Sequence, residues 1–291
     1  MIIKIKQKMA AYMELSRLSN LPTVWTNAIV GMTISSGFLK NPLFLLAGFS
    51  LFYISGMFLN DASDWEKDSK ERPSRPVPKG AVSLKEVYIT GFILLLGANF
   101  LILYEAFRTN NKSMYIVLLY SLLLSFAIVS YNFCYTNKTP LLMGICRALI
   151  YIISAQIGSK VLKMEVWIIS AVFIFYIMGL TYIAKQETKT RLRYKSGFIF
   201  ILFPLIYALF KVNFLSFTIV IFLLFLAILV FVLYNTLKNN FSIQTTVIFL
   251  ISAISIWDAL LLSINGFFTL SILAVICFFL TLFFNKFIKG T

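Results

Sequence analysis

A dense group of carboxylates interrupts an otherwise apolar chain at residues 58–80, FLNDASDWEKDSKERPSRPVPKG. The protein has 291 residues and only 11 Asp and Glu, yet five of these acids fall within positions 61–71. Asn60, Asp64 and Asp68 follow one another at intervals of four, and Asp61 precedes Asp64 by three. If the apolar segment before them continues as a helix, all four side chains fall on one stripe.

Such a stripe is unfavourable by itself. Like charges four residues apart cost roughly 0.2–0.5 kcal/mol per pair, and acids at the C-terminal end of a helix oppose its dipole by roughly 0.3–1 kcal/mol each. A bound cation reverses the sign of these terms. Oxygen donors without His or Cys favour a hard ion, Mg²⁺, which commonly shares its coordination with substrate phosphates. The alternative is a solvated helix end with Lys67 and Lys70 as counter-ions.

Membrane spans must position this stripe. Hydrophobic residues make up 60% of the chain and charged residues 13%, whereas a soluble domain has about 25% charged residues. The mean hydropathy is +0.88. Apolar runs of about 18–25 residues, each long enough for a ~30 Å hydrocarbon core, recur throughout. The sequence therefore predicts an all-α fold, a polytopic membrane helical bundle.

Nine or ten transmembrane helices are expected. The ninth candidate is the weakest, because it contains Gln244, several hydroxyl groups and Asp258, so a buried or partial helix is the alternative there. The candidate spans lie near residues 18–37, 42–60, 84–106, 114–134, 140–158, 165–184, 197–211, 214–235, 243–264 and 267–285.

The net charge of +15 resides in the connections between spans. The N-terminal segment and the connections 61–82 and 184–196 fall on one side of the alternation and hold most of the Lys and Arg. By the positive-inside rule, we expect the N-terminus and both loops to be cytoplasmic, in a bacterial inner (plasma) membrane. No basic soluble domain remains to bind nucleic acid, so nucleic acid is not a predicted partner.

The other reactive residue types point to no further site. Cys134, Cys146 and Cys277 have unrelated spacings, which fit neither a disulfide framework nor a zinc site. The chain has no His, the commonest general base. The basic N-terminus lacks the uninterrupted apolar core of a signal peptide, so we interpret it as a cytosolic lead-in.

The stretch NDASDWEKDSKERPSRPVPKG resembles the first signature of the UbiA-type intramembrane prenyltransferases, N-D-x-x-D-x-x-x-D followed by R-P-x-R-P-x-P-x-G, at every signature position. The segments RLSNLPTVWTNAIVGM and PLLMGICRALIYIISAQIG are similar to that family's first and fifth spans. The resemblance covers most of the chain. It implies a single domain over residues 1–291, with helices around a central lipid-accessible cavity.

In that family Mg²⁺ bridges the first-motif acids to the diphosphate of a polyprenyl donor. The resemblance therefore implies Mg²⁺ as the cofactor and four metal ligands, Asn60, Asp61, Asp64 and Asp68. Asp64 and Asp68 are also expected to be catalytic, and the motif arginines Arg72 and Arg75 to bind the substrate.

The second acidic motif of the family, Y-x-x-x-D-x-x-x-D, corresponds here to YIAKQETKT. Gln186 and Thr190 replace the two Asp, and Glu187 is the acid that remains nearby. Basic residues of this loop could neutralise a diphosphate in place of a second metal. Alternatively, these basic residues only set the orientation of the chain in the membrane. The form TYIAKQE resembles a divergent, EboC-like branch. Two further catalytic residues, Tyr182 and Lys185, and three substrate contacts, Gln186, Glu187 and Lys189, are predicted here.

Other polar residues lie inside predicted spans, where ionisable groups are costly. Arg147 sits seven residues into the fifth span, about 10 Å deep, and is predicted to reach a diphosphate. Asn27 has a similar depth and could bond either substrate or a neighbouring helix. Asp258 is expected to pair with a neighbouring helix.

The leading hypothesis is a membrane prenyltransferase that moves a polyprenyl group from an allylic diphosphate to an unidentified small-molecule or lipid acceptor, with release of pyrophosphate. The alternative is a degenerate member that binds or transports a lipid-linked or isoprenoid precursor without catalysis. A CDP-alcohol phosphotransferase is disfavoured, because its D-G-x-x-A-R signature is absent. Membrane lipid is a further expected partner, and the sequence predicts no oligomeric state.

Overall fold

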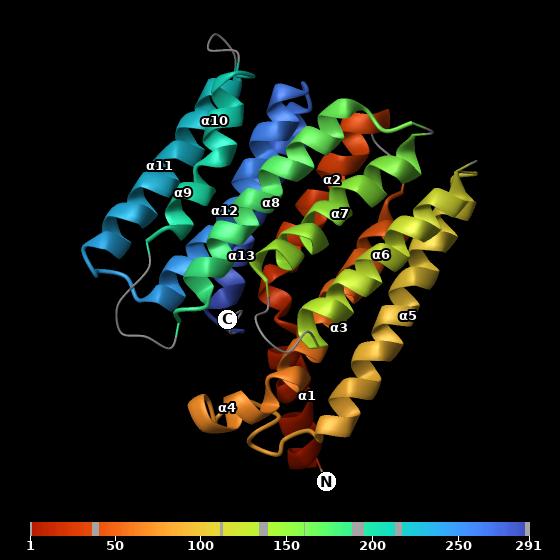
Figure 1. Ribbon diagram of the computed structural model, residues 1–291, viewed down its shortest axis with the longest axis vertical. Helices are drawn as coiled ribbons and strands as arrows, with labels where there is room; N and C mark the ends of the chain where they lie inside the picture. Colours follow the sequence, from red (N-terminus) through yellow and green to blue (C-terminus); the bar gives the residue numbers. More distant parts are fainter. Residues whose placement is uncertain are drawn as a thin grey trace.

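Long apolar helices stand side by side and make up almost the whole structure (Figure 1). The computed structural model describes residues 2–36, 41–110, 113–133, 139–159, 161–187, 195–212 and 217–288, and these ranges contain no strand. Eight described helices are long and apolar enough to cross a membrane, by length and composition. They are α3 (Leu43–Ser63), α5 (Leu84–Arg108), α6 (Met114–Phe133), α7 (Pro140–Gly158), α8 (Met164–Ala184), α11 (Phe217–Leu237), α12 (Ile243–Ile264) and α13 (Phe268–Asn285).

Two further segments match predicted spans but are shorter. The turn η1 (Leu18–Asn20) leads into α2 (Leu21–Ser36), and α9 (Gly197–Ile201) is followed by α10 (Phe203–Leu209). The break between α9 and α10 falls just before a proline, a residue suited to the first turn of a new helix. With these two, the described chain accounts for all ten predicted spans.

The pair α9–α10 runs antiparallel along α8. At one end, Gly179 and Gly197 bring two backbones together so closely that a Cβ on Gly179 would lie 2.4 Å from the Gly197 oxygen. At the other end, the Tyr207 hydroxyl donates to Glu165 at 3.4 Å, near the start of α8. The short pair therefore follows most of the length of a full span.

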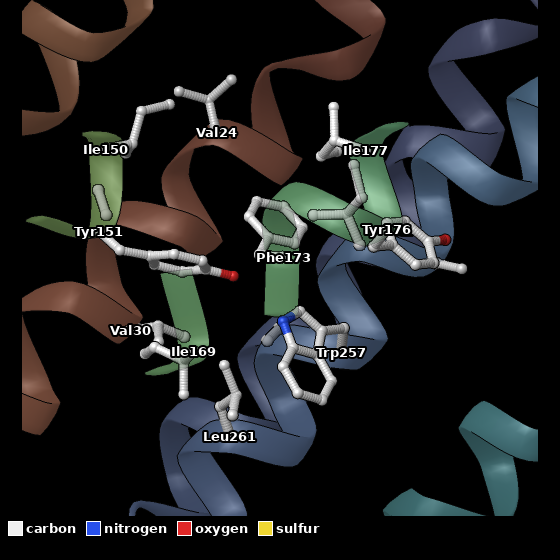
Figure 2. Close-up of a cluster of buried hydrophobic side chains, with 14 of the residues drawn as sticks. Val24, Val30, Ile150, Tyr151, Ile169, Phe173, Tyr176, Ile177, Trp257 and Leu261 are labelled. Atoms are coloured by element: carbon white, nitrogen blue, oxygen red, sulfur yellow. The ribbon is translucent and has the colours of Figure 1, made fainter. Parts of the chain in front are cut away.

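The centre of the bundle is α12, the span predicted to be the weakest; that prediction is wrong, because its mean hydropathy of 2.3 exceeds the 1.7 of α3 and of α7. Of its most apolar window 78% is buried, against 22% for α13. Large rings from α7, α8 and α12, namely Tyr151, Phe173, Tyr176 and Trp257, pack together with no exposed surface (Figure 2). The polar residues of α12 bond to other helices, as Asp258 does when it accepts a hydrogen bond from Asn27 of α2.

Two helices lie beyond one end of the bundle, α1 (Ile2–Ser16) and α4 (Trp65–Glu71) (Figure 1). Ala11 and Leu15 of α1 pack against Phe58 and Ala62 at the end of α3, and thereby brace the acidic segment. At the same end, Asn285 donates to Asn20 at 3.2 Å. The chain therefore enters and leaves the bundle at one end, as an even number of crossings requires.

Candidate active site

The two charged loops meet at this end of the bundle, where Arg72 Nη2 lies 3.4 Å from Glu187 Oε2. A cavity of about 670 Å³ opens between them, with walls from α3, α4, α6, α7, α8 and α12. The predicted site residues that line it are Asn60, Asp64, Asp68, Arg72, Arg75, Arg147, Lys185 and Glu187. The lining does not include Asn27, Asp61, Tyr182 or Gln186. Lys189 lies outside the described residues, as do Thr190, Arg191 and Arg193.

The acidic stripe spans a joint between two helices. α3 ends at Ser63 and α4 starts at Trp65, with Asp64 between them. Backbone bonds continue across the joint, from Asp64 N to Asn60 O at 2.9 Å and from Asp68 N to Asp64 O at 2.8 Å. Residues four apart therefore still lie on one face across the joint, and Asn60, Asp64 and Asp68 all line the same cavity.

Arg75 binds two of the predicted metal ligands. Its Nη1 lies 2.7 Å from Asp68 Oδ2 and 3.2 Å from Asp61 Oδ1. Arg17 Nη2 lies 2.8 Å from the same oxygen of Asp61. Asp61 thus faces two guanidinium groups and not the cavity, whereas Asp64 and Asp68 belong to the cavity wall.

Burial changes the acid–base behaviour of two carboxylates at the mouth, Asp68 and Glu187. It raises the pKa of Asp68 above its ordinary value of 3.8, although the nearby Arg75 lowers it. Burial likewise raises the pKa of Glu187 above 4.5, against the lowering effect of Arg72. Both groups therefore hold a proton at a higher pH than a solvated carboxylate does.

Among the described residues of the second loop, Ala184, Lys185 and Glu187 line the cavity. Gln186 is buried, and its amide donates to the Tyr182 carbonyl at 3.2 Å. Tyr182 was predicted to be catalytic, but its side chain is 40% exposed and stacks on Phe200 with 6.0 Å between the ring centres. The packing of α9 on α8 directs this ring away from the cavity.

Arg147 is the deep cation of the cavity. Its guanidinium donates to Asn27 Oδ1 at 3.1 Å and to Thr23 Oγ1 at 3.3 Å. Asn27 in turn donates to Asp258 Oδ2 at 2.7 Å. The predicted pairing of Asp258 with a neighbouring helix is found. For Asn27, the structure shows hydrogen bonds to neighbouring helices, which was one of the two predicted alternatives.

Several cavity residues escaped the sequence analysis. Arg17 counted only as a topology signal, although it is the first residue of the quoted first-span segment and lines the cavity. Asn20, Tyr53, Tyr131 and Asn132 also line it. Single Asn and Tyr residues in apolar spans carry no periodic signal, so only the spatial arrangement of the helices reveals them.

The match to a known family covers residues 21–196, more than half of the chain, and the family is described as the UbiA prenyltransferase family. The chain belongs to the UbiA prenyltransferase family. The matched residues of this UbiA protein include both charged loops.

The curated relatives of this UbiA protein are archaeal. One from Methanocaldococcus jannaschii, called digeranylgeranylglyceryl phosphate synthase, is 38% identical over 96 residues, which are 31% of this chain and 33% of the relative. A protein of the same name from Methanococcus aeolicus is 34% identical over 93 residues, 31% of this chain and 33% of the relative. The chain thus spans about a third of the length of the curated relatives it matches.

A solved structure gives the fold. It concerns "the biosynthesis of Digeranylgeranylglyceryl phosphate synthase in membranes" and superposes with a TM-score of 0.60 over 90% of this chain and 99% of that chain, at 20% identity. At that identity the likeness shows the UbiA-like membrane fold alone. Together with eight apolar helices, the family identifies an integral membrane protein.

Proposed function

We propose that this protein is a membrane prenyltransferase that moves a polyprenyl group from an allylic diphosphate to an acceptor and releases pyrophosphate. The observation that carries the proposal is the composition of the cavity. Charged groups from both loops gather at its mouth, and its inner wall carries apolar side chains of α8 and α12, namely Ile177, Leu180, Val247, Ile251 and Ile254. A diphosphate head and an isoprenoid tail need these two environments side by side.

The donor set at the mouth fits Mg²⁺ that binds together with substrate. Among the described residues no three His, Cys, Asp or Glu side chains gather to hold a metal by themselves. Mg²⁺ usually needs only one or two carboxylates, with waters and substrate phosphates as the remaining ligands. Asp64, Asp68 and the amide oxygen of Asn60 meet this requirement. The ion would supply charge neutralisation on the diphosphate.

Cationic side chains then act on the leaving group. Arg72 and Lys185 come from different loops and line the same mouth, so they can stabilise the charge that develops on pyrophosphate as the allylic C–O bond breaks. The acceptor forms the new bond to the allylic carbon and loses a proton. Because the Tyr182 ring faces away, a carboxylate such as Glu187, with its raised pKa, or the acceptor's own acidity remains for this proton.

We also propose that the cavity opens to the cytoplasm. The asymmetry of Lys and Arg between the two sides supports this orientation. A bacterial inner membrane remains a proposal, since the curated relatives are archaeal.

The decisive experiment incubates purified protein with Mg²⁺ and labelled prenyl diphosphates of several lengths, with a lipid extract as the source of acceptor. We expect Mg²⁺-dependent transfer of label to lipid. Asp64→Ala and Asp68→Ala should abolish Mg²⁺-dependent binding of the donor while the protein still inserts and folds. Glu66→Ala is the matched control, because Glu66 is an exposed acid on the same helix outside the cavity.

Two results would contradict the proposal in different ways. Equal donor binding by the wild type and both Asp variants would remove the metal–diphosphate site. Tight, Mg²⁺-dependent binding without transfer to any acceptor would favour the non-catalytic lipid-binding alternative.

A further inference from the structure

The buried carboxylate of Asp258 takes no part in the proposed reaction. It lies on α12 with no exposed surface, and it falls outside residues 21–196, which match the UbiA family. Burying a charge is costly unless a partner of opposite sign compensates it. Inside a membrane, a charged side chain with such a partner often serves function.

The hydrogen bonds to Asp258 fit its ionised form. The Tyr151 hydroxyl donates to Oδ1, and the Asn27 amide nitrogen donates to Oδ2 at 2.7 Å. Thr26 makes a further side-chain hydrogen bond to the carboxylate. Asn27 also donates to the Tyr151 hydroxyl at 3.3 Å, which leaves the proton of that hydroxyl for Asp258. Both carboxylate oxygens thus act as acceptors, as in an ionised Asp.

The cation that balances Asp258 is Arg147, on the other side of Asn27. Arg147 Nη1 donates to Asn27 Oδ1 at 3.1 Å, so one amide accepts from the cation and donates to the carboxylate. In the described part of the chain, no Asp or Glu lies within 4.0 Å of this guanidinium, and no Lys or Arg lies within 4.0 Å of Asp258. Because a guanidinium keeps its charge in proteins, the two buried charges sum to zero through Asn27.

This balance affects the cavity, because Arg147 belongs to its wall. Arg147 is 7% exposed and lines the cavity, whereas Asn27 and Asp258 lie behind it, completely buried. The guanidinium also donates to Thr23 Oγ1 at 3.3 Å, and its carbon lies 5.5 Å from the centre of the Tyr53 ring. An anion in the cavity therefore meets a fixed cation with a carboxylate behind it. Charges in a medium of low polarity act over several ångströms, so such an anion is repelled by Asp258 as well as attracted by Arg147.

We propose that Asp258 is the internal counter-ion of Arg147 and limits the affinity of the cavity for anions, so that released pyrophosphate can leave. The inference rests on the proposed prenyl transfer, which produces pyrophosphate in this cavity. Without Asp258, Arg147 would add a full positive charge to a site that already contains Arg72 and Lys185. Asp258 touches no ligand of the cavity and is a positioning residue, which acts through Asn27.

The test measures binding of inorganic pyrophosphate to the full chain in a neutral detergent, by calorimetry with and without Mg²⁺. Asp258→Asn removes the charge at nearly constant volume, and the Tyr151 hydroxyl can accept from the new amide as readily as it donates. This variant should bind pyrophosphate more tightly, on the order of tenfold, because a repulsion between like charges disappears.

Two further variants show whether the effect depends on Arg147. Arg147→Gln should weaken pyrophosphate binding. In that background Asp258→Asn should have little further effect, because a buried carboxylate that has lost its cation takes up a proton. Glu165→Gln is the matched control, since it removes one negative charge near the start of α8, and the cavity residues of α8 lie toward the other end of that helix. It should leave pyrophosphate affinity unchanged.

A purely structural role for Asp258 predicts the opposite result, because a loosened site binds its ligand less tightly. Weaker or unchanged pyrophosphate binding by Asp258→Asn would overturn the inference, and so would an equal change with and without Arg147. The absence of pyrophosphate binding in both the wild type and Asp258→Asn would also contradict it.

Folding and transfer are separate measurements. If Asp258→Asn fails to fold, charge balance predicts that the double variant with Arg147→Gln folds, and failure of that pair as well would rule out the counter-ion. Pyrophosphate binding that follows the expected pattern, without transfer from any labelled prenyl diphosphate, would contradict the proposed function and support the counter-ion role.

Discussion

Arg75 is the side chain whose replacement tests the electrostatics of the site most directly. Its Nη1 joins Asp61 and Asp68 at 3.2 and 2.7 Å, and the side chains of the three residues are 15%, 7% and 6% exposed. Arg75→Gln removes the cation and leaves two buried carboxylates, of which only Asp61 keeps a guanidinium, that of Arg17. We expect this variant to be markedly less stable than the wild type when Mg²⁺ is absent.

The burial of the cluster sets the size of the effect. Breaking a buried ion pair by removing one partner costs about 3–5 kcal/mol, because the other charge stays buried without compensation. At a few degrees per kcal/mol, the melting temperature should fall by the order of 10 °C. Saturating Mg²⁺ should restore part of the loss, since Asp68 lines the cavity and a divalent ion can replace the missing charge beside it.

The assay is thermal unfolding of the detergent-solubilised protein with and without Mg²⁺. Lys70→Gln is the matched control, because it removes one positive charge from an exposed position on α4, the helix that carries Asp68, and should shift stability by no more than about 0.5 kcal/mol. An Arg75→Gln variant that melts with the wild type in the absence of Mg²⁺ would refute the reasoning. A variant destabilised equally with and without Mg²⁺ would refute the part that assigns the ion to Asp68.

Three further predictions follow from the loops. Burial raises the pKa of Asp68 and of Glu187, so both side chains take up a proton at a higher pH than solvated carboxylates do, and protonation favours the folded state. A protonated carboxyl no longer binds Mg²⁺, so the increase in melting temperature that Mg²⁺ produces should shrink on acidification, and at a higher pH than expected for solvated carboxylates. A cysteine at Ser74, in a background without native cysteines, should resist an impermeant thiol reagent added outside intact cells; efficient labelling would invert the topology. Restoring the second motif with Gln186→Asp and Thr190→Asp should raise the Mg²⁺ stoichiometry in calorimetry. An unchanged stoichiometry would contradict the idea that the loss of these two carboxylates limits the number of Mg²⁺ ions bound.

The sequence was enough to predict the spans and the acidic stripe. Span length follows from hydropathy alone, so all ten predicted segments correspond to helices of the described chain. The spacing of Asn60, Asp64 and Asp68 correctly predicted that they share one face, because helical hydrogen bonds continue through the joint at Asp64. Both the spans and the acidic stripe depend on the pattern of neighbouring residues, which can be read from a single sequence.

Features that depend on the packing between helices could not be predicted. Asp61 binds Arg17, 44 positions away, and no spacing rule connects them. Tyr182 turned outward because two glycines, Gly179 and Gly197, let α9 approach α8 closely and present Phe200 to its ring. Asp258 made the most buried span look like the weakest one, because its partner, Asn27, lies 231 positions away. In each case the deciding partner belongs to another helix.

The contact between the loops suggests how the site can work without the second pair of Asp. The resemblance to the family implies that metal and diphosphate connect two acidic loops; here Arg72 and Glu187 connect the loops directly. This ion pair is long, at 3.4 Å, and the Arg72 side chain is 30% exposed, so its contribution to stability is small. A weak pair opens at little cost, and an arriving diphosphate offers Arg72 a stronger, charge-assisted partner. Glu187, released from Arg72, would then be the one carboxylate of the second loop that can accept a proton or an ion.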